Sequence, residues 1–217
     1  MRKPVGIDVY IQKIKPVIRK TKFSQLKIDE IAKAMDISKV TLYKHFSSKD
    51  EILEQVTDYY IDFLQSSDNV VSDESLSYAE RFRHTFAQSL IGVLYVSDLF
   101  LEDLRTYYPH HYERLAAAQQ SRSRNLQSFF EAGMERQAFN RLNPQLFMVQ
   151  DDAVLRRFLD PAFSIQHDIT LKQAILDFYR MKQYQLLTPA YLHAALEDQE
   201  DQSALENKIA QILQNFS

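Results

Sequence analysis

Apolar residues recur every three or four positions along almost the whole chain, which is the period of an α-helix with one buried face. No run alternates apolar and polar residues in the way that a half-buried strand would. The chain has 3 glycines and 6 prolines, so few residues interrupt this pattern. The sequence therefore predicts an all-α protein.

Two short helical patterns near the N-terminus are separated by a brief break. The apolar positions are Ile28, Ile31, Ala32 and Met35 in the first pattern, and Val40, Leu42, Tyr43 and Phe46 in the second. Asp36 stands at the break, and aspartate tolerates the left-handed conformation of a tight turn better than most residues other than glycine. Ser38 is the expected N-cap of the second helix. We interpret residues 26–53 as a helix-turn-helix with a third helix entering behind it.

Further helices are predicted on both sides of this motif. Ile7, Ile11, Ile14 and Ile18 form the apolar stripe of a first helix, in which Pro16 predicts a kink or a late start. Capping residues at Ser48 and Glu51, Ser77 and Glu80, Asn143 and Pro144, and Thr170 and Gln173 mark later helix starts. The expected later helices cover 49–65, a stretch from 77 that includes 90–96, 98–108, 109–136, 144–159 and 170–186, followed by a short helix after Thr188 and a last one with Leu205, Ile209, Ile212 and Phe216.

The charge is distributed unevenly along the chain. Residues 1–50 contain 12 Lys/Arg against 5 Asp/Glu, whereas residues 51–217 contain 14 against 24. A basic segment that coincides with a helix-turn-helix provides the positive charge that binding to phosphates requires. A solvated basic face would explain the charge, but not its coincidence with the motif.

The composition narrows the class of protein further. Without cysteine, the chain has no disulfides and no Cys-containing zinc site, which suits a reducing compartment. The N-terminal residues lack the apolar core of a signal peptide, and the longest apolar run, Leu90 to Val96, is too short to span a membrane. We expect a cytoplasmic protein that is neither secreted nor embedded in a membrane.

The second helix of the motif contains candidate DNA-reading residues. In a helix-turn-helix, the first helix crosses the DNA backbone and the N-terminal residues of the second contact base edges in the major groove. Here those residues are Ser38, Lys39, Val40 and Thr41. Lysine can donate to guanine O6 and N7, threonine can donate or accept, and an apolar side chain can meet a thymine methyl group. Lys44 and His45 follow one turn later and are expected to face phosphates.

The spacing I-A-x-x-M-D-I-S-K-V-T-L-Y-K-H-F-x-S-K-D-E-I-L closely resembles the DNA-binding domain of the tetracycline-repressor (TetR) family of bacterial transcription regulators. The resemblance implies that Tyr43, Lys44, His45 and Lys49 grip phosphates. The chain departs from the family pattern at four positions: Asp36 and Lys22 replace glycines, Val40 replaces a small residue, and Lys27 replaces a capping threonine. Lys27 could contact a phosphate directly instead of capping the helix.

The resemblance also implies a division of the chain and a ligand-responsive function. We expect a helix-turn-helix DNA-binding domain at 1–48, a linking helix at 49–65, and a helical effector-binding and dimerisation domain at 66–217. A looser similarity over 137–189 implies that two late helices pair with those of a second subunit, where Phe178 is a candidate interface residue. Aromatic residues that could line an effector cavity in the bundle are Phe86, Phe100, Tyr107 and Phe129. Taken singly, each of these aromatics is better explained as a core residue.

The expected function is that of a homodimeric, ligand-responsive repressor that binds double-stranded DNA at a palindromic operator, lies on the bacterial nucleoid when bound, and is released by a small, mostly apolar effector. One alternative is a DNA-binding protein of the same fold without a small-molecule effector, which would organise the chromosome or be controlled by a protein partner. A helical-bundle enzyme is the other alternative. Clusters of acidic and histidine residues occur at 102–113 and 151–167, but they lack the spacing of a metal or catalytic motif. We therefore expect no enzymatic activity, no catalytic residues, no bound metal and no cofactor.

Overall fold

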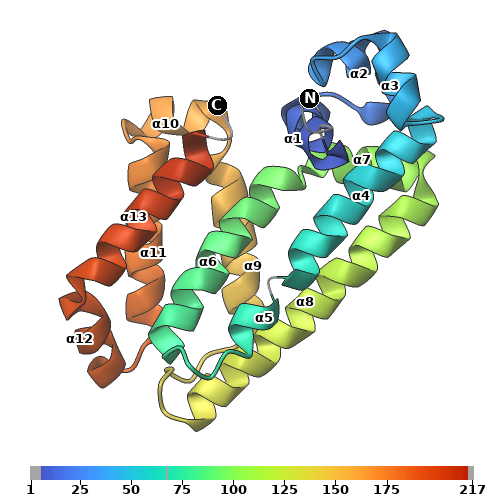
Figure 1. Ribbon diagram of the computed structural model, residues 1–217. Helices are drawn as coiled ribbons and strands as arrows, with labels where there is room; N and C mark the ends of the chain where they lie inside the picture. The colour runs from blue at the N-terminus through green and yellow to red at the C-terminus, as the bar shows by residue number, and fades with distance from the viewer. Residues whose placement is uncertain (1–5, 67, 215–217) are drawn as a thin grey trace, which may run out of the picture. The chain divides into compact units, whose positions relative to one another are not determined.

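The computed structural model describes residues 6–66 and 68–214, and the elements in those ranges are helices joined by loops and turns, with an isolated β-bridge between Phe139 and Leu187 (Figure 1). The all-α prediction is confirmed. Phe216 of the expected last helix lies outside the described residues. None of the helices in the described ranges is both long enough and apolar enough to cross a lipid bilayer.

The chain forms two compact units, and each is built from two stretches of sequence. The first unit comprises Met1–Ser66 and Tyr95–Gln120, and the second comprises Ser67–Leu94 and Ser121–Ser217. This division differs from the one expected from the sequence at residues 95–120, which belong with the N-terminal helices rather than with the C-terminal bundle. Sequence order alone could not show this, because the packing partners of those residues lie far away along the chain.

The first unit contains α1 (Ile7–Lys20), η1 (Phe23–Gln25), α2 (Ile28–Ala34), α3 (Lys39–His45), α4 (Lys49–Ser66), α7 (Asp98–Tyr107) and the beginning of α8 (Pro109–Glu135). α1 packs against α2, α4 and α7. Of its predicted stripe, Ile11, Ile14 and Ile18 are buried, whereas Ile7 in the first turn is exposed. α1 continues through Pro16, although proline lacks the N–H that would bond to residue 12.

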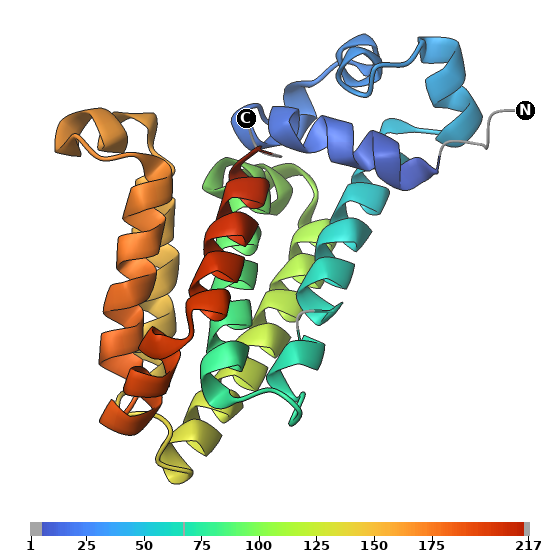
Figure 2. The same cartoon turned by 60° about the vertical axis from the view of Figure 1, so that its left-hand side comes forward.

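The second unit contains α5 (Asp68–Val71), α6 (Tyr78–Tyr95), the rest of α8, α9 (Pro144–Phe158), α10 (Pro161–His167), α11 (Leu171–Leu186), α12 (Pro189–Glu197) and α13 (Gln199–Gln214). The last residue of α6, Tyr95, belongs to the first unit. α11 packs against both α9 and α13. α9 and α11 run side by side in both views, and α10 connects them (Figures 1 and 2).

Local sequence signals set most of the helix starts. Ser77 and Glu80 form both bonds of a capping box, and Asn143 and Thr170 accept hydrogen bonds from the third residue of their helices. Ser48 accepts the backbone N–H of Glu51 as expected, but the carboxylate of Glu51 binds Ser47 instead of returning to Ser48. The N-terminal ends of these helices can therefore be traced to individual side chains.

A close contact in the second unit depends on a glycine. A Cβ atom built at Gly133 on α8 would lie 2.0 Å from the ring of Phe139, which is buried. The ring thus packs directly on the helix backbone. The backbone around Phe139 is fixed further by Asn140, whose side-chain amide donates to the carbonyl oxygens of Gln185 and Leu187.

The outer faces of α9 and α11 present apolar side chains to solvent. More than half of the surface of each of four residues is exposed: Leu146, Val149, Met181 and Tyr184. Phe178, which we expected at a subunit interface, instead lies in the core of the second unit, where its ring contacts Phe86 and Phe158. Helical geometry allows this, because at 3.6 residues per turn the side chains of Met181 and Tyr184 are rotated about 60° and 120° from that of Phe178, towards the solvent side of α11.

A buried ion pair links the same two helices. The ammonium of Lys182 on α11 lies 2.7 Å from a carboxylate oxygen of Asp151 on α9, and it also donates to the carbonyl oxygen of Phe147. Burial raises the pKa of Asp151 to about 6, although the neighbouring ammonium of Lys182 opposes this shift. Because a buried charge is costly without its partner, the pair fixes how α9 and α11 fit together.

Candidate DNA-binding interface

The turn of the helix-turn-helix has the backbone conformation that the sequence predicts. Asp36 adopts a left-handed conformation with φ 57°, and the N–H of the next residue, Ile37, returns to the carbonyl oxygen of Ala32 at 3.0 Å. Ser38 then caps α3 by accepting the N–H of Thr41 at 3.0 Å. Aspartate therefore performs the role that glycine has in the family pattern.

α3 is held on one face and open on the other. Leu42 and Phe46 are buried in the first unit, whereas Lys39, Val40, Tyr43 and Lys44 are exposed. The exposed residues include the N-terminal end of the helix, which is the end that a recognition helix directs at base edges. Three of the four residues that we predicted to read bases, Ser38, Lys39 and Val40, are exposed, and Thr41 is partly exposed.

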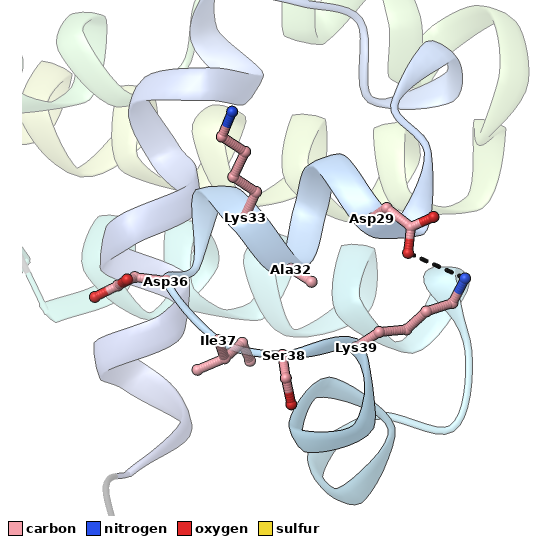
Figure 3. A pocket seen from close by; sticks show the side chains of 7 residues that line it. All are labelled: Asp29, Ala32, Lys33, Asp36, Ile37, Ser38 and Lys39. Carbon is pink, nitrogen blue, oxygen red and sulfur yellow. Dashed lines mark ion pairs between the residues drawn. The ribbon is translucent and has the colours of Figure 1, made fainter.

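Three of the predicted base-reading side chains already have hydrogen-bond partners. The hydroxyl groups of Ser38 and Thr41 lie 2.9 Å apart and share a hydrogen bond. The ammonium of Lys39 lies 3.0 Å from a carboxylate oxygen of Asp29 on α2 (Figure 3). This carboxylate raises the pKa of Lys39 by accepting its hydrogen bond. Val40 projects from the same end of α3 as an exposed apolar side chain.

The residues predicted to bind phosphates have different surroundings. Lys27 is exposed, and its backbone N–H donates to Glu30, so the start of α2 is capped without the usual threonine. Tyr43 and Lys44 are exposed on α3. The ring of His45 packs 5.1 Å from that of Tyr10 on α1. Of these residues, Lys27, Tyr43 and Lys44 are the ones most open to a ligand.

The ammonium of Lys49 makes its contacts within the first unit. It donates to the carbonyl oxygen of Ser24 at 3.0 Å and lies 5.0 Å from the ring centre of Phe23. Partial burial lowers its pKa, while the charge of Asp103 acts in the opposite direction. Lys49 therefore connects the start of α4 to η1, and its contact with a phosphate stays a prediction.

Two carboxylates, Asp103 and Asp29, support the motif, and the sequence predicted this role for neither of them. Asp103 on α7 is fully buried and accepts hydrogen bonds from both the backbone N–H and the hydroxyl of Ser24. Asp29 binds Lys39 across the hollow between α2 and α3 (Figure 3). No local spacing signals Asp103, because its partner lies 79 residues away. Asp29, at the exposed start of α2, could have been noticed as an acid beside a predicted recognition helix.

The structure does not gather the four aromatic residues that we expected to line one effector pocket. Phe86 and Phe129 are buried in the core of the second unit, whereas Phe100 is buried in the core of the first, where its ring lies edge-on to Tyr60. Tyr107, on α7 of the first unit, is 61% exposed. Phe86 and Phe129 therefore remain the candidates within the second unit.

A helix-turn-helix with an exposed, lysine-bearing second helix, set in a basic N-terminal segment, defines a DNA-binding transcription regulator. Residues 17–56 match the sequence model described as bacterial regulatory proteins of the tetR family. A relative in Bacillus subtilis (strain 168), the uncharacterised HTH-type transcriptional regulator YvaF, is 22% identical over 149 residues, which cover 68% of this chain and 78% of YvaF.

Solved structures share the fold at low sequence identity. The ketosteroid transcriptional regulator KstR2 of Mycobacterium tuberculosis aligns with a TM-score of 0.63 and 14% identity over 86% of this chain and 97% of its own. AibR, in a crystal structure with isovaleryl coenzyme A and operator DNA, aligns with a TM-score of 0.56 and 15% identity over 80% of this chain and 96% of its own. The TetR family regulator PfmR from Thermus thermophilus gives a TM-score of 0.56 and 15% identity over the same shares.

Proposed function

We propose that the protein is a homodimeric repressor that binds a palindromic operator through α3 and is released by a small, mostly apolar effector. The observation that carries the DNA-binding part is the conformation of the motif. Asp36 forms the left-handed turn, Ser38 caps α3, and Lys39, Val40 and Tyr43 are exposed along the recognition helix. Such a protein would act in the bacterial cytoplasm, on the nucleoid when bound to DNA.

The exposed apolar side chains of α9 and α11 support the dimer. Leu146 and Val149 lie on the first half of α9, and Met181 and Tyr184 lie on the last half of α11. Hydrogen bonds from Lys182 to Phe147 and Gln150 show that these two halves are neighbours. A two-fold axis through this patch would bring it against its own copy, since an isologous interface uses the same surface on both subunits. The second recognition helix would then lie about one DNA turn, 34–36 Å, from the first, or a multiple of that distance.

The effector part of the proposal rests on the aromatic core of the second unit. Phe82, Phe86 and Tyr179 pack on one another there, and Phe129 packs beside Phe130 and Phe139. Helical bundles place apolar ligands among side chains of this kind. The complex of AibR with isovaleryl coenzyme A and operator DNA supports a ligand-responsive function for a chain of this fold. A ligand can release DNA only by binding better to a state in which the recognition helices no longer fit the operator.

Enzymatic activity has less support. Two carboxylates in the clusters that could have been catalytic have structural partners: Asp103 binds Ser24, and Asp151 pairs with Lys182. Neither carboxylate is therefore placed to act as a general acid or base. The remaining alternative is a regulator of the same fold that answers no small molecule, and this alternative would be favoured if no compound that shifts its stability also released DNA.

The deciding experiment is the selection of bound fragments from genomic DNA, followed by binding assays on the enriched sequence. We expect an inverted repeat, and we expect Lys39→Ala or Thr41→Ala to cost roughly 1–3 kcal/mol on that sequence and to relax its base preference. Lys49→Ala is expected to weaken all DNA sequences alike and to flatten the salt dependence by about one unit. Failure to enrich any sequence would contradict the proposal.

A further inference from the structure

The ion pair between Lys39 and Asp29 joins the recognition helix to the helix before it. Lys39 is the first residue of α3 and Asp29 is the second residue of α2. The lysine nitrogen and the carboxylate oxygen are 3.0 Å apart, and the two side chains are 52% and 72% exposed, respectively. An ion pair this exposed contributes little to stability, so holding the fold together does not account for it.

Glu30, the acid next to Asp29 on α2, differs from Asp29 in having a structural role. Glu30 accepts the backbone N–H of Lys27 at 2.7 Å and thereby caps α2. The carboxylate of Asp29 instead points across the hollow between α2 and α3 to the ammonium of Lys39 (Figure 3). A negative charge is thus placed beside the residue predicted to contact bases, on a surface that must approach negatively charged DNA.

We propose that Asp29 is a specificity-determining residue, which positions Lys39 for base edges and withholds it from phosphates. The inference rests on the proposed DNA-binding function. An ammonium has three N–H donors, so Lys39 can keep its bond to Asp29 and still donate to guanine O6 and N7. Lysine is otherwise a flexible point charge that pairs with any phosphate, and phosphate contacts carry no sequence information. Because Asp29 is negatively charged, it repels an anionic phosphate beside Lys39 more strongly than the uncharged acceptors of guanine.

Asp29 should therefore affect the affinity for the operator and the affinity for other DNA differently. In the specific complex the ion pair persists, and its cost is small. On unrelated DNA, Lys39 either contacts a phosphate against the repulsion of Asp29 or breaks the pair to make that contact. Asp29 therefore lowers non-specific affinity more than operator affinity, and specificity is the ratio of the two.

The test compares Asp29→Asn, which removes the charge and keeps the shape, with the unmodified full-length protein. Affinities are measured for the selected operator and for a scrambled duplex of equal length over a series of salt concentrations. We expect the affinity of Asp29→Asn for scrambled DNA to rise about 2- to 5-fold, which corresponds to an exposed ion pair. Its salt dependence should steepen by about one unit, because Lys39 gains a phosphate contact. Operator affinity should change by less than this, so the specificity ratio falls.

Glu102→Gln is the matched control, because Glu102 is also an exposed acid of this unit and pairs with Lys22 at 3.2 Å, but it lies on α7, outside the helix-turn-helix. We expect this variant to leave the specificity ratio unchanged. An equal fall of the ratio in Glu102→Gln would show that any loss of negative charge has this effect, and it would overturn the proposal.

A substitution of Lys39 itself tests whether Asp29 acts by positioning this lysine or by repelling DNA directly. Lys39→Gln should lose operator affinity but keep its affinity for scrambled DNA, and adding Asp29→Asn to it should leave the ratio unchanged. The proposal is overturned if Asp29→Asn changes the ratio equally with and without Lys39, or if it leaves the ratio of the otherwise unmodified protein unaltered. If the unmodified protein enriches no operator, the DNA-binding proposal itself fails, which is a different result.

Discussion

The carboxylate of Asp103 accepts both the backbone N–H and the hydroxyl of Ser24, so a fully buried acid on α7 holds the segment just before α2. The carbonyl oxygen of the same serine accepts the ammonium of Lys49. Ser24 thus connects η1 to the start of α4 and to α7, all within the first unit. The position of the recognition motif in that unit depends on residues that are distant from it in sequence.

Removal of this carboxylate should destabilise the first unit. Asp103→Ala leaves the N–H and the hydroxyl of Ser24 without their acceptor, and hydrogen bonds to a charged group contribute about 1.5–3 kcal/mol each. We expect a loss of about 2–4 kcal/mol in the free energy of unfolding, measured by chemical denaturation. Glu102→Ala is the control on the same helix, because Glu102 makes an exposed ion pair with Lys22 and should cost under about 1 kcal/mol. Equal losses in the two variants would contradict this account.

The burial of the Lys15 ammonium predicts an unusual dependence of stability on pH. Its ammonium is buried on α1, lies 3.7 Å from the ring centre of Tyr95, and donates to the hydroxyl of Tyr59. Burial lowers its pKa from 10.5 to about 8. The unfolded chain therefore binds this proton more tightly than the folded protein, and the resulting penalty is complete below pH 8 and fades as the pH rises towards 10.5.

Lys15→Met removes this penalty. We expect the variant to be more stable than the unmodified protein by about 1–2 kcal/mol at pH 7, after allowance for the lost contacts with the tyrosine rings. The difference should shrink between pH 8 and pH 10, as measured by denaturant unfolding at each pH. Lys13→Met, at an exposed position of the same helix, controls for the exchange of residue type. A difference that does not change with pH would argue against the stated cause.

Two substitutions of Ser38 should separate the stability of α3 from its binding of DNA. Ser38→Ala removes the N-cap and should cost about 1 kcal/mol of stability. Ser38→Asp keeps a capping oxygen and should leave the melting temperature nearly unchanged. It also places a negative charge beside the DNA, so operator affinity should fall by at least about 10-fold, equal to about 1.4 kcal/mol. Normal operator affinity in Ser38→Asp would mean that this end of α3 does not approach DNA.

The apolar patch on α9 and α11 predicts where charge will separate subunits. Leu146→Glu and Met181→Glu place a carboxylate in the proposed interface, and each should yield a folded monomer when its mass is measured in solution. Val9→Glu, at an exposed apolar position on α1, should leave the oligomeric state unchanged. Phe178→Glu should instead unfold the second unit, because it buries a charge. An unmodified protein that is monomeric at micromolar concentration would rule out the dimer.

Local physics made much of the fold predictable from the sequence. The 3.6-residue period of apolar positions identified the helices, since one stripe of each had to be buried. Ser38, Ser77, Asn143 and Thr170 were predicted caps because they bond to groups only three residues away. The left-handed turn at Asp36 could be predicted in the same way. The DNA-binding motif could therefore be found from residues 26–53 alone.

Contacts between distant residues could not be predicted in this way. Only the tertiary structure placed residues 95–120 in the first unit, because the bond between Asp103 and Ser24 crosses 79 positions without a local signal. It also assigned Phe86 and Phe100 to different cores and turned Phe178 inward. The period of a single helix indicates which face is buried, but the partner of an aromatic residue on that face depends on which helices pack together, and the period does not contain that information.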